Sequence, residues 1–154
     1  MSSASRDRAD DLRQIESGRL LALDLGAKRV GVAVTDELQI TVTPLAPLER
    51  RNWKHFLQRV VNIIESYDAR ALIIGLPLNM DGTKGPAAAD AVRIAENFRK
   101  SLRVPVFLQD ERLTSIAAET ELRARGADSK EIERRIDSAS AAIILRDYLA
   151  RGDQ

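Results

Sequence analysis

An aspartate stands inside a strongly apolar run near the start of this sequence. The segment Leu20–Leu25 reads LLALDL, and only Asp24 breaks it. A run of this kind is typical of a central strand that is buried on both faces. A carboxylate in such surroundings is costly unless it is paired, hydrogen-bonded or bound to a metal ion. Asp24 is therefore either part of a site or a cap for the turn that follows it.

The next two segments continue a sheet. Residues 26–29 (GAKR) make a tight connection, and valine alternates with small residues over 30–35. This alternation predicts a second strand that pairs with the first as a hairpin. A third strand is expected within residues 40–48, at a sheet edge because Pro44 and Pro47 weaken its pairing. The three strands are expected to be antiparallel.

The rest of the chain alternates between helical and strand patterns. The expected segments are a helix over 53–64, a strand over 71–76, a loop over 77–86, a helix over 87–102, a strand over 104–109, a helix over 113–125 and a last helix over 128–150. This order favours an α/β fold in which a mixed five-stranded sheet carries helices on both faces. Strands one, four and five are expected to be parallel and central, with ligands at their carboxyl ends.

Length and composition fit one domain. The chain has 154 residues, and we expect a single domain over residues 19–150, a disordered extension over 1–18 and a tail over 151–154. No run approaches the roughly 18 apolar residues of a membrane helix, and residues 1–18 lack the apolar region of a secretory signal. We therefore expect a cytoplasmic protein with no membrane partner.

Several chemistries are excluded by residue type. There is no cysteine, which rules out a thiolate metal site and a cysteine nucleophile. His55 is the single histidine and lies on the polar side of an amphipathic segment, so histidine catalysis is not expected. The net charge is only +1, and a nucleic-acid partner must be argued from local clusters.

A second inward-facing acid is expected on the last helix. Asp137 shares a helical face with Ser140, Ala141, Ile144 and Tyr148, and this face is otherwise small or apolar. Such a face packs against a sheet, so the carboxylate is expected to point inward. The alternative is a rotated helix in which Asp137 pairs with an arginine at the rim.

A third acid ends the fifth strand. Because side chains alternate between faces, one of Asp110 and Glu111 should point toward the same crevice as Asp24, and the residues alone leave the choice open. Three acids from distant segments make an oxygen-only site suited to Mg²⁺ or Mn²⁺. Such sites perform phosphoryl transfer.

Basic and amide side chains accompany each acid. Lys28 and Arg29 follow Asp24, Arg112 follows Glu111, Arg134 precedes Asp137, and Asn79 and Lys84 belong to the long loop. Charged residues on helices are by default a solvated surface. Beside three acids, however, they fit contacts to a phosphate backbone.

Four segments resemble the YqgF/RuvX family. They are LALDLGAKRVGVAVTD, IIGLPLNMDGTKGPAAADA, LQDERLTSIAA and IDSASAAIIL, which lie in order between residues 18 and 150. The family is described as a Holliday-junction resolvase or as a nuclease that trims the 5′ end of the 16S rRNA precursor. The resemblance implies a ribonuclease H-like fold and assigns the catalytic acids to Asp24, Glu111 and Asp137. In the wider class the second acid commonly ends the fourth strand, but here that strand ends in GLP.

Three functions follow, in order of preference. The first is a Mg²⁺- or Mn²⁺-dependent endonuclease that processes the rRNA precursor in ribosome biogenesis. The second is a resolvase of branched DNA, which needs a dimer to cut two opposed strands, whereas a processing enzyme can be a monomer or a homodimer. The third is a weakly catalytic nucleic-acid-binding factor in transcription or ribosome assembly. The first hairpin is also similar to that of actin-like kinases, but those need two such domains and this chain has room for one.

Overall fold

The computed structural model describes residues 17–111, 124, 126 and 129–152, and within the last range the side chains of residues 139–150. The extension expected over residues 1–18 lies almost entirely outside this part, and so does the helix expected over 113–125. The division into domain, extension and tail therefore stays a prediction. No helix in the described part is long and apolar enough to cross a membrane.

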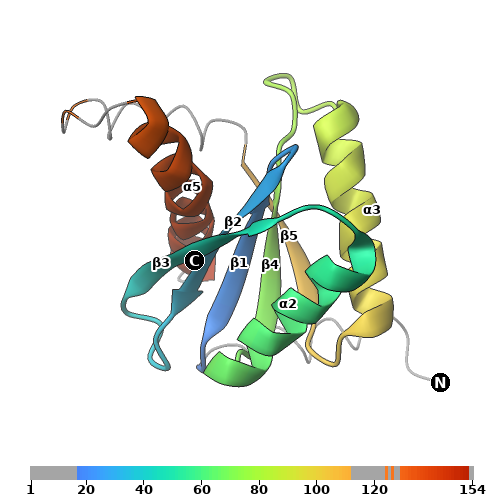
Figure 1. Cartoon of the computed structure of the whole chain (residues 1–154). Coiled ribbons are helices and arrows are strands. Elements are labelled where there is room, and N and C mark those ends of the chain that lie inside the picture. The colour runs from blue at the N-terminus through green and yellow to red at the C-terminus, as the bar shows by residue number, and fades with distance from the viewer. Residues whose placement is uncertain (1–16, 112–123, 125, 127–128, 153–154) are drawn as a thin grey trace.

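A five-stranded mixed sheet forms the centre of the fold (Figure 1). Its strands are β1 (Leu20–Leu25), β2 (Arg29–Thr35), β3 (Val42–Glu49), β4 (Ala71–Leu76) and β5 (Val106–Asp110), in the order β3-β2-β1-β4-β5. β1 and β3 are antiparallel to β2, and β4 is parallel to β1 and to β5. The expected fold class is confirmed, with β3 at one edge. The expectation that β5 is central is wrong, because in the described part of the chain β5 pairs with β4 alone and forms the other edge.

Helices cover both faces of this sheet. α2 (Trp53–Tyr67) and α3 (Pro86–Ser101) lie on one face, and α5 (Ser129–Gly152) packs on the other (Figure 1). Side chains of β1 alternate between the two cores: Leu21 and Leu23 pack with α2 and α3, whereas Leu20 and Ala22 pack with α5. This alternation decides which polar side chains meet at the carboxyl ends of the strands.

The β2–β3 hairpin opens wider than the sequence predicts. The Asp36 carboxylate accepts hydrogen bonds from the backbone N–H groups of Ile40 and Thr41, at 2.7 and 3.0 Å. These bonds hold residues 36–41 as a loop, so β3 begins at Val42 rather than at residue 40. They also lower the pKa of Asp36, with the bond from Thr41 making the largest contribution.

Candidate active site

A tight turn follows Asp24. The Gly26 N–H donates to the carbonyl oxygen of Arg29 at 2.9 Å, which closes the connection between β1 and β2. A β-carbon on Gly26 would stand 2.5 Å from that oxygen, so the turn accepts only glycine. Asp24 lies at the point where β1 leaves the core: residues 20–23 are fully buried, and Asp24 is half-buried.

Strand alternation places Asp24 on the face that α5 covers. Leu20 and Ala22 belong to the core packed against α5, and Asp24 is the next residue of the same parity. On the neighbouring strand Leu23 pairs with Ile74, so the register brings Asp24 beside Gly75. Asp24 thus points toward α5 at the carboxyl end of the sheet.

Glu111 lies on the same face, across Gly75 from Asp24. Its N–H donates to the carbonyl oxygen of Leu76 at 3.0 Å, which extends the β4–β5 pairing by one residue. The residue is 8% exposed, and both carboxylate oxygens are shielded from solvent. A β-carbon on Gly75 would stand 3.3 Å from Glu111 Cγ and 2.6 Å from Ile144 Cδ1. Glu111 and the α5 side chain Ile144 therefore share one face.

Asp110 directly precedes Glu111 and therefore points to the opposite face of the sheet. It pairs with Leu76, and its neighbours of the same parity, Val106 and Leu108, pack in the core formed with α2 and α3. Alternation therefore turns Asp110 away from the face that carries Asp24 and Glu111. The structure places Asp24 and Glu111 on one face of the sheet and Asp110 on the other.

The position of Asp137 is described only as part of α5. Ser140, Ala141 and Ile144 follow it by three, four and seven residues and are fully buried against the sheet. The small residues in this stretch let α5 pack closely, as the sequence predicts. The side chain of Asp137 lies outside the described residues, so its expected orientation stays a prediction.

The oxygen donors suit a hard divalent cation. Within the part of the chain that the structure describes, no three acidic or histidine side chains group around one point. Asp24 and Glu111 share one face of the sheet, and the expected set includes a third acid, Asp137, on α5. Carboxylate oxygens without nitrogen or sulfur ligands fit Mg²⁺ or Mn²⁺, and a cation offsets the cost of burying a carboxylate such as Glu111.

The expected phosphate contacts are only partly described. Lys28 is exposed in the turn after Asp24, Arg29 is half-buried at the start of β2, and Lys84 is exposed in the long loop. The Asn79 side chain donates to Thr83 Oγ1 at 3.0 Å and so helps to close this loop. Arg112 and the side chain of Arg134 lie outside the described residues.

Sequence reasoning missed Arg50. Its Nη1 donates to the Gly26 carbonyl oxygen at 3.0 Å, and its N–H donates to the Lys28 carbonyl oxygen at 2.9 Å. Its Nη2 lies 2.6 Å from Asp90 Oδ2 on α3, and Arg93 also bonds to this carboxylate. Arg50 thus ties the turn after Asp24 to α3. No local pattern marks this role, because every partner comes from another segment.

Asp90 is held ionised by this network. Burial raises the pKa of its carboxyl group, but the hydrogen bonds and charges of Arg50 and Arg93 outweigh burial and leave the pKa below its ordinary value. The network is therefore an ion pair at neutral pH, and Arg50 connects it to the turn that follows Asp24.

Known proteins identify the family. The family profile described as "RuvX: Holliday junction resolvase" matches residues 18–151. A relative from Anaeromyxobacter sp. (strain K), named "Putative pre-16S rRNA nuclease", is 41% identical over 133 residues, which are 86% of this chain and 97% of that protein. A relative of the same name from Roseiflexus sp. (strain RS-1) is 37% identical over 134 residues, which are 87% and 95% of the two chains.

One solved structure supports the fold of this chain but not its function. The fowlpox virus resolvase, determined with Holliday-junction DNA, superposes with a TM-score of 0.50 at 14% identity, over 86% of this chain and 97% of that one. Together with the profile match this confirms the ribonuclease H-like fold. The chain belongs to the RuvX family.

Proposed function

We propose that this chain is a divalent-metal-dependent endonuclease, and that Asp24, Glu111 and Asp137 hold its metal ion. The observation that carries the proposal is the placement of Asp24 and Glu111 on one face, on either side of Gly75, at the carboxyl ends of parallel strands. Ligands of open α/β sheets bind at this edge. Asp110 has the opposite parity, which favours Glu111 as the second acid.

Each residue has a distinct task in this proposal. Asp24 and Glu111 would hold the metal ion from the sheet side, and Asp137 would complete the donor set from α5. A bound Mg²⁺ or Mn²⁺ would supply the positive charge that activates the attacking water and stabilises the leaving oxygen. Lys28 lies in the adjacent turn and would hold the phosphate backbone in register.

The proposed substrate is the 5′ region of the 16S rRNA precursor, cut in the cytoplasm during ribosome biogenesis. The curated relatives whose names state this activity match nearly their whole length, at up to 41% identity. The family profile names Holliday-junction resolution instead, which makes junction cleavage the second candidate. A resolvase must act as a symmetric dimer, whereas RNA processing is compatible with a monomer or a homodimer.

Cleavage of matched substrates tests the proposal. Purified protein is incubated with Mg²⁺ or Mn²⁺ and either a 5′-labelled precursor RNA fragment or a labelled four-way DNA junction, with Asp24→Asn as the inactive control. We expect the wild-type protein to cut the RNA at a defined position only when metal is present. Cleavage of the junction but not the RNA would make the protein a resolvase.

A third outcome would favour the hypothesis that the protein is a nucleic-acid-binding factor rather than a nuclease. RNA binding that survives Asp24→Asn, with no metal-dependent cleavage of either substrate, would contradict the nuclease proposal. It would assign the protein a role as a nucleic-acid-binding factor instead.

A further inference from the structure

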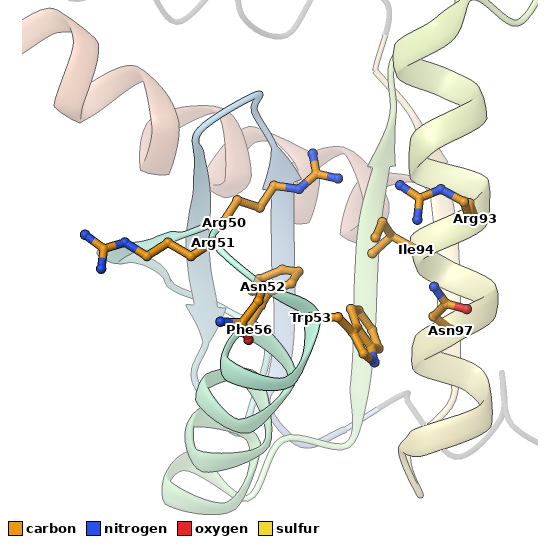
Figure 2. A pocket seen from close by; sticks show the side chains of 8 residues that line it. All are labelled: Arg50, Arg51, Asn52, Trp53, Phe56, Arg93, Ile94 and Asn97. Carbon is orange, nitrogen blue, oxygen red and sulfur yellow. The ribbon is translucent and has the colours of Figure 1, made fainter.

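A polar cavity opens on the sheet face opposite α5. Its volume is about 190 Å³, and it lies between the start of α2 and the middle of α3 (Figure 2). Residues that line it include Arg50, Asn52, Trp53, Arg93 and Asn97. Arg51 also lines it, but its guanidinium group pairs with Glu49 and extends away from Arg93 (Figure 2). The site proposed above uses none of these residues.

We propose that this cavity is a second binding site for the nucleic-acid substrate. Guanidinium groups hold a backbone phosphate there, and the Trp53 ring offers a surface on which one base can stack. The inference rests on the proposed function, because it names a further stretch of the same substrate's path. It adds a contact that none of the acids or the turn residues supplies.

The arginines of the cavity carry more positive charge than the nearby carboxylate neutralises. Arg50 and Arg93 share the single carboxylate of Asp90. Arg93 is 63% exposed, and one guanidinium carries five N–H donors, so it can bind Asp90 and a phosphate together. No acidic residue occupies the first turn of α2, so no acid there offsets the positive end of the helix dipole. Phosphate is the anion that guanidinium groups and a helix N-terminus both favour.

Trp53 is placed as a stacking platform. Its ring packs against Phe98 at a centroid distance of 4.9 Å and meets Phe56 edge-on at 6.2 Å. These contacts fix the indole from the core side, while the residue stays half-exposed at the cavity. Stacking on an aromatic ring is tolerant of base identity, since every base has a π-face.

One side chain links the cavity to the turn that follows Asp24. Arg50 lines the cavity, yet its Nη1 bonds to the Gly26 carbonyl oxygen in the turn that follows Asp24. Figure 2 shows the Arg50 and Arg93 side chains reaching toward each other between that turn and α3. In this proposal a strand held in the cavity crosses the carboxyl edge of the sheet to reach Asp24 and Glu111, which lie on the face that α5 covers.

Metal-free binding measures this contact without cleavage. Fluorescently labelled precursor RNA is titrated in EDTA over a range of KCl concentrations, and fluorescence anisotropy gives the affinity. The variants are Arg93→Gln, which removes one cation, Asn97→Asp, which adds an anion without breaking an ion pair, and Trp53→Phe. Lys100→Gln is the matched control, because it removes an exposed cation of the same helix that does not line the cavity. Unfolding midpoints verify that each variant is folded.

We expect Arg93→Gln to weaken binding several-fold and to reduce the slope of log K against log[KCl] by about 0.7–0.9, the loss of one phosphate contact. Asn97→Asp should also weaken binding, and Trp53→Phe should weaken it with little change of slope. Lys100→Gln should match the wild type. Wild-type affinity and slope in both Arg93→Gln and Asn97→Asp would overturn the inference, whether or not the protein cleaves RNA. If the cavity variants weaken binding but wild-type protein never cleaves, the nuclease proposal falls and the binding site remains.

Discussion

Glu111 lies against Gly75, so close that a β-carbon on the glycine would stand 3.3 Å from Glu111 Cγ. The same β-carbon would stand 2.6 Å from Ile144 Cδ1 on α5. The end of β4, where related folds commonly carry their second acid, is thus left without a side chain. An acid that follows β5 takes up this space.

Replacing Gly75 should disturb both neighbours. Gly75→Ala places a methyl group against the fully buried Ile144 and should lower the free energy of unfolding by about 1–3 kcal/mol, as overpacking does. Urea denaturation measures this loss. Ile144→Val removes the closest atom, so the double variant should lose less stability than the two single losses added together. Strict additivity would show that Gly75 and Ile144 do not compete for this space.

Neighbouring arginines should differ in their contribution to stability. Arg50 and Asp90 are 17% and 28% exposed, and Arg50 also bonds to the Gly26 carbonyl oxygen. Arg50→Ala should therefore cost about 1.5–3 kcal/mol, the range for a hydrogen-bonded charged group. Arg51 pairs with Glu49 on the surface, where both are more than half exposed, so Arg51→Ala should cost about 0–1 kcal/mol. Equal losses in urea denaturation would contradict the role given to Arg50.

Much of this architecture was predictable, and the reasons are local. LLALDL reads as a buried strand, and the prolines of β3 predict an edge. Periodicity could not place β5 at an edge, because an apolar strand looks alike in either position. Nor could it choose between Asp110 and Glu111, since their parity depends on where β5 begins its pairing with β4. The sequence did not predict the role of Arg50, because tertiary contacts alone define that role.

Acid should weaken the ion pair of Asp90. Its pKa is lowered in the folded protein relative to the ordinary 3.8, so it stabilises the fold above pH 3.8 and loses this effect as the pH falls through the lower folded value. Asp90→Asn should therefore be less stable than wild type at pH 7, and the gap should shrink below pH 3.8. Urea denaturation across this range measures the gap. A gap that is constant with pH would show that Asp90 does not titrate with a shifted pKa.

The Ser140 hydroxyl should be dispensable for folding. Its Oγ is fully buried in α5 and has no hydrogen-bond partner in the described part of the chain. Burying a hydroxyl without a partner costs about 1–3 kcal/mol, so Ser140→Ala should keep or raise stability. Ala141→Ser, which adds a hydroxyl at a fully buried position of the same helix, is the reciprocal control and should lower stability. Destabilisation by Ser140→Ala in thermal unfolding would reveal a partner for this hydroxyl.

The choice between Glu111 and Asp110 tests the account most directly. Calorimetric titration with Mn²⁺ and cleavage of precursor RNA are measured for wild type, Asp24→Asn, Glu111→Gln and Asp110→Asn. We predict that Asp24→Asn and Glu111→Gln bind Mn²⁺ more weakly and cleave about a hundredfold more slowly or worse, whereas Asp110→Asn behaves as wild type. Loss of metal binding in Asp110→Asn, with Glu111→Gln unaffected, would contradict the site proposed here.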